Sequence, residues 1–350
     1  MLNINQDIVL FLEKFGISSE LFDFVPLQAD ASLRRYYRIS RKSTISIPSN
    51  YDGTKIDFTK VNSLLLMHCP VSYQSIEPFI DIAEHLLQNS IIAPKIYFHD
   101  KEMGLMLLED FGDKTLNLHI NQNQNNSFEI YREITDLLVE IQNIKLPSFL
   151  SNYSDEILLN ELNVFCKYYY LYTKNCEMDV EKKNDFLSIF SEVLSENNKK
   201  TQDLGLKKVI VLRDFHVDNL MYIKGYDELS SKYIGVLDFQ DALLGNPIYD
   251  VVSLLDDARN YVDEELSSNI KEYYIKKTKT PLEYFFETYN IFALQRNLRI
   301  LGVFARKFVL ERNDSYLKMI PIMINYIERN VKNSDKNSNE KIRKIYNLVM

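Results

Sequence analysis

The stretch VIVLRDFHVDNLMYI, residues 209–223, holds a cluster of polar residues between two apolar runs. Both runs are short and rich in aliphatic residues, so we predict that they are buried strands. An unpaired charge is expensive to bury, and charged residues at the junction of two such strands therefore indicate a chemical function. Within the cluster, Asp214 and Asn219 stand five residues apart. A third candidate, Asp238, follows the strand-like run YIGVL at 233–237.

These three side chains match the needs of phosphoryl transfer, in which a protein mainly positions the reactants and neutralises charge. The reaction needs a carboxylate beside the attacking hydroxyl and ligands for Mg²⁺, which prefers carboxylate, amide and water oxygens. Asp214 and Asn219 have the spacing that carries these roles in protein-kinase catalytic loops. The sequence therefore predicts Asp214 as the catalytic carboxylate and Asn219 and Asp238 as metal ligands. Mg²⁺ is the predicted cofactor and ATP the predicted co-substrate.

The composition limits the class of protein. Sequence-independent binding of nucleic acid needs a basic surface, whereas the formal net charge of this chain is −8. No nucleic-acid partner is therefore expected. Cys69, Cys166 and Cys176 match neither a disulfide framework nor paired metal ligands, and they favour a reducing compartment. The sequence has no signal-peptide pattern and no run of about 20 apolar residues. We predict a cytoplasmic protein without a membrane span.

The periodicity of apolar residues changes along the chain. An amphipathic helix is predicted before Gly16, and strands are predicted from FDFVPL, YYRIS, SLLLM, KIYF and GLMLLED. The run SIEPFIDIAEHLLQN predicts one helix after the third strand. From Asn126 onward the pattern is helical apart from the strands around the catalytic stretch, with helices predicted near 127–144, 154–174, 181–197, 250–260, 263–276, 281–311 and 314–331.

This order predicts an α+β protein with two lobes. The N-terminal lobe, 1–110, is expected to be a five-stranded, mostly antiparallel sheet that binds a nucleotide. A hinge at 111–113 would lead to a mostly helical lobe at 114–335, which holds the catalytic and substrate residues. The tail at 336–350 is polar with mixed charge, and we expect it to be solvated.

The chain resembles the aminoglycoside phosphotransferase and choline-kinase-like branch of the protein-kinase-like fold. The resemblance is closest to bacterial cell-wall sugar kinases, which phosphorylate the anomeric hydroxyl of N-acetylmuramate and N-acetylglucosamine. It spans nearly the whole chain, in blocks that keep the order of the family: PLQADASLRRYYRIS (26–40), SLLLMHCP (63–70), GLMLLEDFGD (104–113), VLRDFHVDNLM (211–221), GVLDFQDALLGNPIYDVVSLLDDAR (235–259) and ALQRNLRILGVFARKF (293–308). The resemblance implies an ATP-dependent kinase of an amino sugar in cell-wall recycling.

The resemblance also implies roles for residues around the catalytic loop and the hinge. His216 and Asp250 would support the loop without touching the reactants, with Asp250 as the N-cap of the following helix. Asp218 would either touch the substrate or be a solvated loop carboxylate. Backbone groups from Glu109 to Phe111 would read the adenine edge of the nucleotide.

The chain departs from the wider kinase pattern around the phosphates. Neither G-x-G-x-x-G nor G-x4-G-K occurs, and the segment expected over the phosphates, 28–35, has no glycine. Met67 stands about where protein kinases carry a lysine. We expect Ser32 and nearby backbone groups to donate hydrogen bonds to the phosphates. Because guanidinium groups suit phosphate oxygens, the missing charge is expected from one of three arginines, Arg34, Arg35 or Arg38.

The acceptor is predicted from the charges in the helical half. N-acetylmuramate carries a lactyl carboxylate and calls for a cation, whereas an aminoglycoside calls for an acidic pocket. Arg259, Arg296 and Asn297 are the candidates for the substrate pocket, since they lie in blocks that carry the resemblance. Two alternatives stay open: a kinase for an aminoglycoside, choline or homoserine, and a non-catalytic nucleotide-binding scaffold linked to tRNA modification.

Overall fold

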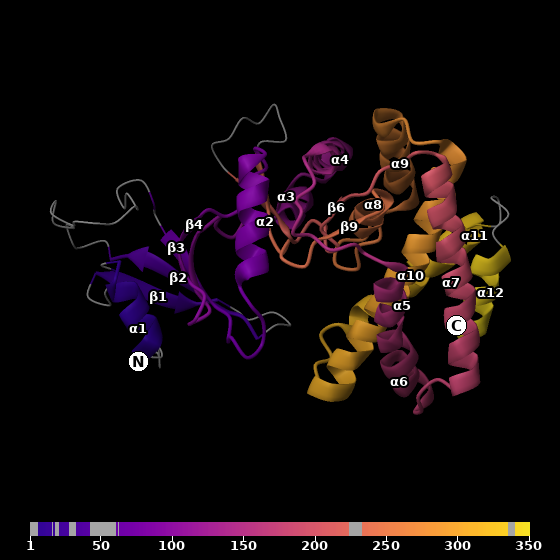
Figure 1. Ribbon diagram of the computed structural model, residues 1–350, viewed down its shortest axis with the longest axis horizontal. Coiled ribbons are helices and arrows are strands. Elements are labelled where there is room, and N and C mark those ends of the chain that lie inside the picture. Colours follow the sequence, from indigo (N-terminus) through magenta and orange to yellow (C-terminus); the bar gives the residue numbers. More distant parts are fainter. Residues whose placement is uncertain are drawn as a thin grey trace.

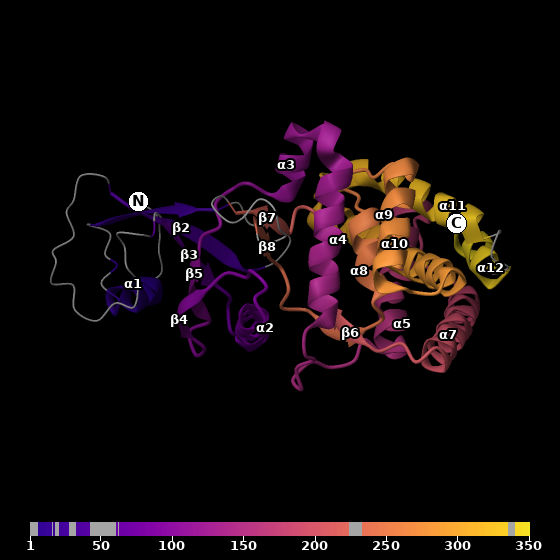
Figure 2. The same cartoon turned by 90° about the horizontal axis from the view of Figure 1, so that it is seen from above.

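The computed structural model of the chain has two lobes along its longest axis (Figure 1). A sheet and the helices packed on it form one lobe, and a larger group of helices, which includes the C-terminus, forms the other (Figures 1 and 2). The predicted bilobal α+β class is confirmed. The structure describes residues 6–15, 17, 21–27, 33–42, 61, 63–223, 233–334 and 340–350.

The N-terminal sheet has five antiparallel strands in the order β1-β2-β3-β5-β4. Each strand overlaps one of the predicted runs. The elements of this lobe are α1 (Gln6–Glu13), β1 (Phe22–Pro26), β2 (Arg35–Arg41), β3 (Ser63–His68), α2 (Glu77–Gln88), β4 (Ile96–Asp100) and β5 (Leu105–Glu109).

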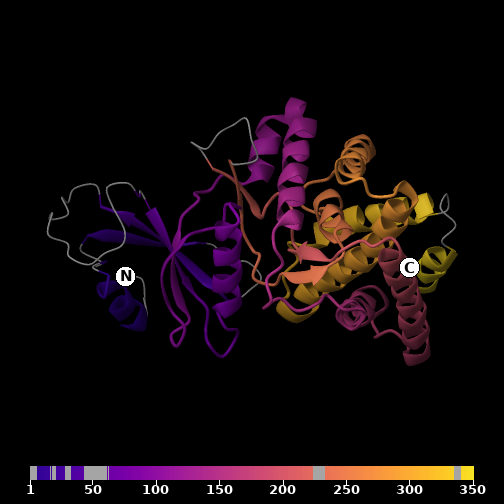
Figure 3. The ribbon, with the colours of Figure 1, turned by 45° about the horizontal axis from the view of Figure 1, so that its top comes forward.

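The central strands of this sheet are buried on both faces. On one face, Phe11 of α1 packs in a cluster with Leu66 of β3. On the other face, α2 lies between the sheet and the helical lobe (Figure 3). Phe79 of α2 contacts Phe239 of the helical lobe, with ring centroids 4.8 Å apart. Because alternate side chains of a strand point to opposite faces, a strand covered on both sides reads as a continuous apolar run such as SLLLM.

The C-terminal lobe combines helices with two small antiparallel sheets. Its helices are α3 (Leu116–Gln122), α4 (Ser127–Asn143), α5 (Asp155–Val164), α6 (Tyr170–Lys174), α7 (Val180–Asp203), α8 (Ile248–Leu255), α9 (Glu264–Thr278), α10 (Leu282–Glu311), α11 (Ile320–Ser334) and α12 (Glu340–Val349). The sheets pair β6 (Val209–Val211) with β9 (Leu243–Gly245), and β7 (Leu220–Tyr222) with β8 (Ile234–Val236). The sequence did not predict α3, β9 or α12. Within the described ranges, none of the helices is both long and apolar enough to cross a membrane.

The end of the chain differs from the prediction. A solvated tail was expected at 336–350, but α12 packs against α7 and α11. Ile342, Ile345 and Val349 are buried, and the Tyr170 hydroxyl donates a hydrogen bond to the carbonyl oxygen of Val349 at 3.2 Å. These apolar residues recur at helical spacing among charged ones, so α12 has one narrow apolar face. The solvated tail is therefore wrong for these residues, while the other lobe boundaries stay predictions.

A close helix contact fixes α10 against α5. The predicted helix at 154–174 is continuous, but a π-helical turn, η2 (Phe165–Tyr169), separates α5 from α6. Gly302 of α10 lies against this turn, and a Cβ atom at its position would stand 2.6 Å from the carbonyl carbon of Val164. The missing side chain permits this approach of the two backbones.

The buried Lys271 of α9 gives a prediction about stability. Its ammonium group lies 3.8 Å from the centre of the Tyr289 ring, and burial lowers its pKa from 10.5 to about 8, although the charge of Asp256 opposes this shift. The unfolded chain then binds more protons between pH 8 and pH 10.5, so this residue's contribution to stability rises with pH in that window. We expect Lys271→Met to stabilise the protein by up to about 3 kcal/mol at neutral pH.

Urea unfolding at several pH values measures this difference. The advantage of Lys271→Met should shrink as pH rises above 8 and should vanish near pH 10.5. A variant that is less stable than the wild type by the same amount at every pH would contradict the prediction, because the cost of burying the ammonium group would then be fully offset.

Candidate active site

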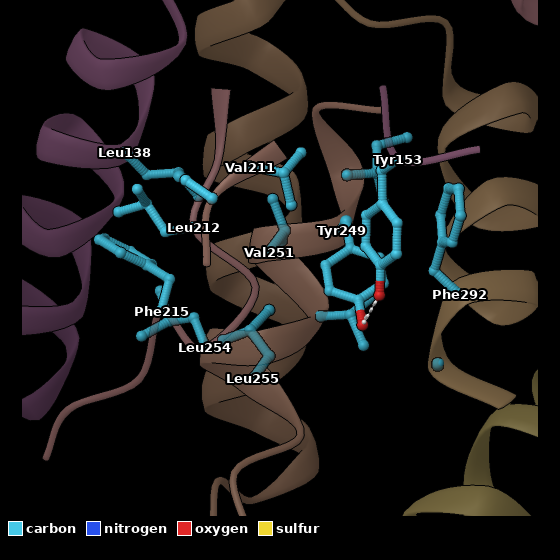
Figure 4. Close-up of a cluster of buried hydrophobic side chains, with 14 of the residues drawn as sticks. Leu138, Tyr153, Val211, Leu212, Phe215, Tyr249, Val251, Leu254, Leu255 and Phe292 are labelled. Atoms are coloured by element: carbon cyan, nitrogen blue, oxygen red, sulfur yellow. Dashed lines mark hydrogen bonds between the residues drawn. The ribbon is translucent and has the colours of Figure 1, made fainter. Parts of the chain in front are cut away.

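The loop that carries Asp214 is anchored by apolar residues before and after it. Leu212 and Phe215 both turn into the core between α4 and α8 (Figure 4). Arg213, between them, has a φ of +71°, which is uncommon for a residue other than glycine. This backbone turn lets Asp214 leave the core while its neighbours stay buried. The apolar neighbours that Figure 4 labels around the loop are Leu138 of α4 and Val251, Leu254 and Leu255 of α8.

Asp250 of α8 holds the same loop through its backbone. The buried carboxylate accepts hydrogen bonds from the amide groups of Leu212 at 2.7 Å and Arg213 at 2.9 Å. Burial raises the pKa of Asp250 to about 7, and the two amide donors act in the opposite direction. The predicted N-cap role is wrong, because α8 already begins at Ile248. Asp250 supports the loop from the side chain of a helix residue instead.

The structure brings Asp214, Asn219 and Asp238 together. The side-chain amide of Asn219 donates a hydrogen bond to the backbone carbonyl of Asp214 at 2.9 Å and lies 3.3 Å from a carboxylate oxygen of Asp238. The backbone amide of Leu237 donates to the carbonyl of Asn219 at 2.9 Å, which links the ends of the paired strands β7 and β8. Gln240 donates to the other oxygen of Asp238 at 2.7 Å. Sequence-distant groups therefore meet at one point.

Asn219 and Asp238 suit a magnesium site. Mg²⁺ keeps several waters and takes one or two carboxylates together with substrate phosphates, so a complete cage of protein ligands is not needed. The Asp238 side chain is 48% exposed and can meet a hydrated ion. Surrounding protein raises the pKa of Asp238; the Gln240 hydrogen bond opposes this, and the negative charge of Asp214 raises the pKa further. A cation at this position would relieve the repulsion between the two carboxylates.

Arg299 of α10 lies beside Asp214. One of its terminal nitrogens is 3.5 Å from a carboxylate oxygen of Asp214. Burial by itself raises the pKa of Asp214, but the positive charges of Arg299, then of Arg296, lower it to about 2. The carboxylate is therefore ionised at neutral pH and can accept a hydrogen bond from a hydroxyl group. Sequence reasoning did not select Arg299, although it stands one turn after Arg296 on the same helix.

Glu161 of α5 connects two arginines around the loop. It pairs with Arg213, and the Nε atom of Arg299 lies 3.9 Å from its second oxygen. The Tyr153 hydroxyl donates a hydrogen bond to the same carboxylate at 2.6 Å. The close approach at Gly302 brings α5 and α10 near enough for these contacts. No local pattern marks Glu161 in the sequence, so only the packing of the two helices identifies it.

His216, Asp218 and Arg259 lie together next to the metal candidates. Arg259 has one nitrogen 3.2 Å from the Nε2 atom of His216 and another 3.7 Å from a carboxylate oxygen of Asp218. His216 in turn lies 3.4 Å from the side-chain amide of Asn219. Asn117 of the unpredicted helix α3 donates to Asp218 at 2.7 Å. These predicted residues are thus brought together, with 32% of the Arg259 side chain exposed.

Arg296 and Asn297 lie elsewhere than predicted. They are 2% and 0% exposed, respectively. Arg296 donates to the hydroxyl of Ser253 at 2.9 Å, and Asn297 donates to the carboxylate of Asp256 at 2.8 Å. Both side chains are directed into the contact between α10 and α8. The prediction that they line the substrate pocket is therefore wrong for this structure.

The hinge residues follow β5 directly. The backbone amide of Glu109 donates to the carbonyl of Lys95 at 2.8 Å, so Glu109 belongs to the sheet. Phe111 packs on Gly235 of β8, where a Cβ atom would stand 2.7 Å from the phenyl ring. The segment thus contacts both lobes, and its role in reading the base stays a prediction. Ser32, which was expected at the phosphates, lies outside the described residues.

The three candidate arginines of the N-terminal lobe differ in their surroundings. Arg34 donates to the side chain of Gln74 at 2.8 Å, and another of its nitrogens lies 3.9 Å from Asp238. Arg35 is exposed at the start of β2. Arg38 is bound by the carboxylates of Asp110 and Asp113, so its guanidinium is not directed at the metal candidates. Of the three, Arg34 therefore lies beside a predicted metal ligand.

A cavity of about 480 Å³ lies at the other end of the β6–β9 pair from Asp214. Its lining includes Lys208 and Gly245, and Gly245 pairs with Val209 at the start of β6. Asp214 follows the opposite end of β6. This cavity therefore lies away from Asp214, and Tyr153, which donates to Glu161, forms part of its wall.

A family model described as the phosphotransferase enzyme family matches residues 24–285. The match covers both lobes and includes the three converging side chains. The chain belongs to this family. Solved structures with a similar fold include a choline kinase from Cryptosporidium parvum. It superposes on this phosphotransferase with a TM-score of 0.61 and 12% sequence identity, over 96% of this chain and 97% of that one. An ADP-bound aminoglycoside phosphotransferase has a TM-score of 0.58 and 12% identity over 93% and 97% of the two chains.

Two named relatives are more similar to this chain in sequence than these two solved structures are. An N-acetylmuramate/N-acetylglucosamine kinase of Neisseria meningitidis is 28% identical over 88% of this chain and 85% of its own length. A kinase of the same name from Pseudomonas aeruginosa is 28% identical over 87% of this chain and 83% of its own length. This phosphotransferase is a kinase, as the sequence predicted.

Proposed function

We propose that this kinase uses Mg-ATP to phosphorylate the anomeric hydroxyl group of an N-acetylated amino sugar, N-acetylmuramate or N-acetylglucosamine. The observation that carries the proposal is the convergence of Asp214, Asn219 and Asp238 around the hydrogen bonds of Asn219. This arrangement supplies a carboxylate for the acceptor and oxygen ligands for a metal ion, which are the main protein groups that phosphoryl transfer requires. The named relatives support the choice of sugar.

In the proposed reaction, the ionised Asp214 accepts a hydrogen bond from the anomeric hydroxyl and then its proton. The hydroxyl oxygen forms a bond to the γ-phosphorus, the bond between that phosphorus and the β–γ bridging oxygen breaks, and ADP leaves. Mg²⁺ held by Asn219 and Asp238 would neutralise charge on the nucleotide phosphates. Arg299 and Glu161 keep Asp214 in position through the contacts on α10 and α5.

The proposed sugar also accounts for a cation near the catalytic loop. N-acetylmuramate carries a lactyl carboxylate, and the partly exposed Arg259 is the candidate to bind it. Asp218 and His216 hold the guanidinium of Arg259 from two directions. A role in the recycling of cell-wall sugars belongs to the same proposal, because the breakdown of the cell wall would supply both acceptor sugars. The protein is expected to act in the cytoplasm, where ATP is present.

Acceptor-dependent ADP release, with and without Mg²⁺, tests the proposal. The panel contains N-acetylmuramate, N-acetylglucosamine, glucosamine, an aminoglycoside, choline and homoserine, and phosphorus NMR identifies the position of the new phosphate. We expect turnover with the two N-acetylated sugars and an anomeric phosphate as the product. Turnover confined to another acceptor would refute the proposed sugar. Binding of Mg-ATP without turnover on any acceptor would favour the scaffold alternative.

Arg34 gives a prediction about nucleotide affinity. Because its guanidinium lies beside Asp238, where the phosphates of a metal-bound nucleotide would be, we expect Arg34→Ala to weaken ATP binding by about 10- to 100-fold. Isothermal titration calorimetry with Mg-ATP measures the dissociation constant. Arg35→Ala is the matched control, since Arg35 is exposed, and it should change affinity by no more than about twofold. Equal affinities of both variants and the wild type would exclude Arg34 as a phosphate ligand.

A further inference from the structure

The side chain of Asp110 is almost completely buried at the point where the sheet ends and the hinge begins. It is 1% exposed and follows directly after the last residue of β5. Arg38 of β2 binds it with two nitrogens, Nε at 2.6 Å and Nη2 at 3.1 Å. The hydroxyl of Ser63, the first residue of β3, donates to it at 2.6 Å. Side chains from two other strands therefore converge on the residue that directly precedes the hinge.

The same group of side chains reaches further into the hinge. The backbone amide of Gly112 donates to Asp110 at 2.9 Å, and Gly112 has a φ of +80°, which favours glycine. Arg38 uses its remaining terminal nitrogen to bind Asp113 at 2.9 Å. Burial raises the pKa of Asp110, but the hydrogen bonds from Arg38 and then Ser63 outweigh it and lower the pKa below its usual value. The carboxylate is thus ionised and satisfied by its four donors.

A buried ion pair of this kind is a weak source of stability, because removing two charges from water offsets much of their attraction. The ion pair has a larger effect on the position of the backbone, because a bidentate arginine–carboxylate contact fixes both the direction and the distance between the two groups. Here it fixes the hinge backbone against β2 and β3. The opposite side of the segment is held by Phe111, which packs on Gly235 of the helical lobe. The backbone at 109–111 is therefore held from both lobes.

We propose that Arg38 and Asp110 are positioning residues for the nucleotide base: they hold the hinge backbone in the shape that an adenine edge requires. The inference rests on the proposed use of ATP. It assigns Arg38 to the base and not to the phosphates, for which the sequence offered Arg38 as one of three candidates. Ser63 takes part as the third donor to the buried carboxylate.

Base recognition and phosphate binding can be measured separately. We compare Mg-ADP with Mg-tripolyphosphate, which has phosphates but no base, by titration calorimetry on the full-length wild type, Arg38→Met and Ser63→Ala. We expect Arg38→Met to weaken Mg-ADP binding by about 10-fold or more and to leave tripolyphosphate binding within about twofold. Ser63→Ala, which removes one donor and keeps the ion pair, should change affinity in the same direction by a smaller factor.

Lys101→Ala is the matched control, since it removes an exposed ion pair with Glu77 in the same lobe, and it should alter neither affinity. The proposal is overturned if both variants bind Mg-ADP like the wild type, or if they lose ADP and tripolyphosphate by the same factor. Should Arg38→Met fail to fold, Ser63→Ala still decides the matter by the same comparison. A wild type that binds no adenine nucleotide would refute the proposed function itself, and this inference with it.

Discussion

Asp214→Asn is expected to lower kcat by about 10²–10⁴-fold while the protein stays folded and still binds Mg-ATP. The amide keeps the shape of the carboxylate but cannot take the proton of the acceptor hydroxyl. The loss should appear in kcat more than in the KM for ATP, because the proposed partner of Asp214 is the acceptor hydroxyl and not the nucleotide base. Steady-state kinetics with a saturating amino sugar measures it.

The contacts of Asp214 allow the loss of activity in this variant to be separated from a loss of stability. Among the described residues, Arg299 forms the ion pair of its carboxylate at 3.5 Å, and the loop around it is held by Asp250 through backbone amides. The melting temperature of Asp214→Asn should therefore stay close to that of the wild type. Near-normal turnover in this variant would refute the role of the carboxylate as the base and would require another group to take the proton.

Asp238→Ala is expected to be nearly as damaging, through the metal ion. A catalytic metal ion stabilises transition-state charge by several kcal/mol, so loss of its carboxylate ligand should lower kcat by about 10³-fold. The concentration of Mg²⁺ that gives half-maximal rate should rise as well, because Asn219 would then be the remaining proposed ligand and would bind the ion weakly. A titration of the rate with Mg²⁺ at fixed ATP measures both effects. Excess Mg²⁺ should restore part of the activity.

Asp241→Asn is the control for this variant. Asp241 is exposed and stands three residues after Asp238, so its replacement removes a nearby negative charge without removing a metal ligand. Its Mg²⁺ requirement should stay close to that of the wild type. If Asp238→Ala and Asp241→Asn shifted the requirement equally, the effect would come from the general charge of the loop, and Asp238 would not be a ligand.

Local sequence patterns were sufficient where neighbouring residues alone decide the structure. The sheet strands and most helices could be predicted because each carries its own apolar period. The loop from Asp214 to Asn219 was recognisable because both residues lie on one short segment between two strands. Asp238 was recognisable because it directly follows a strand-like run, and the pairing of β7 with β8 brings it to that loop.

The sequence therefore determined the fold class, the order of most of the elements and the three residues that meet at the centre of the candidate site. Only the tertiary structure decided which side chains surround them. Glu161 reaches the arginines because Gly302 lets two helices approach. Arg38 of β2 reaches Asp110 at the end of β5 across β3, which lies between the two strands in the sheet. It also decided that α12 packs and that Asn297 is buried. Such contacts join residues far apart in the chain, and a local pattern has no information about the distance between them.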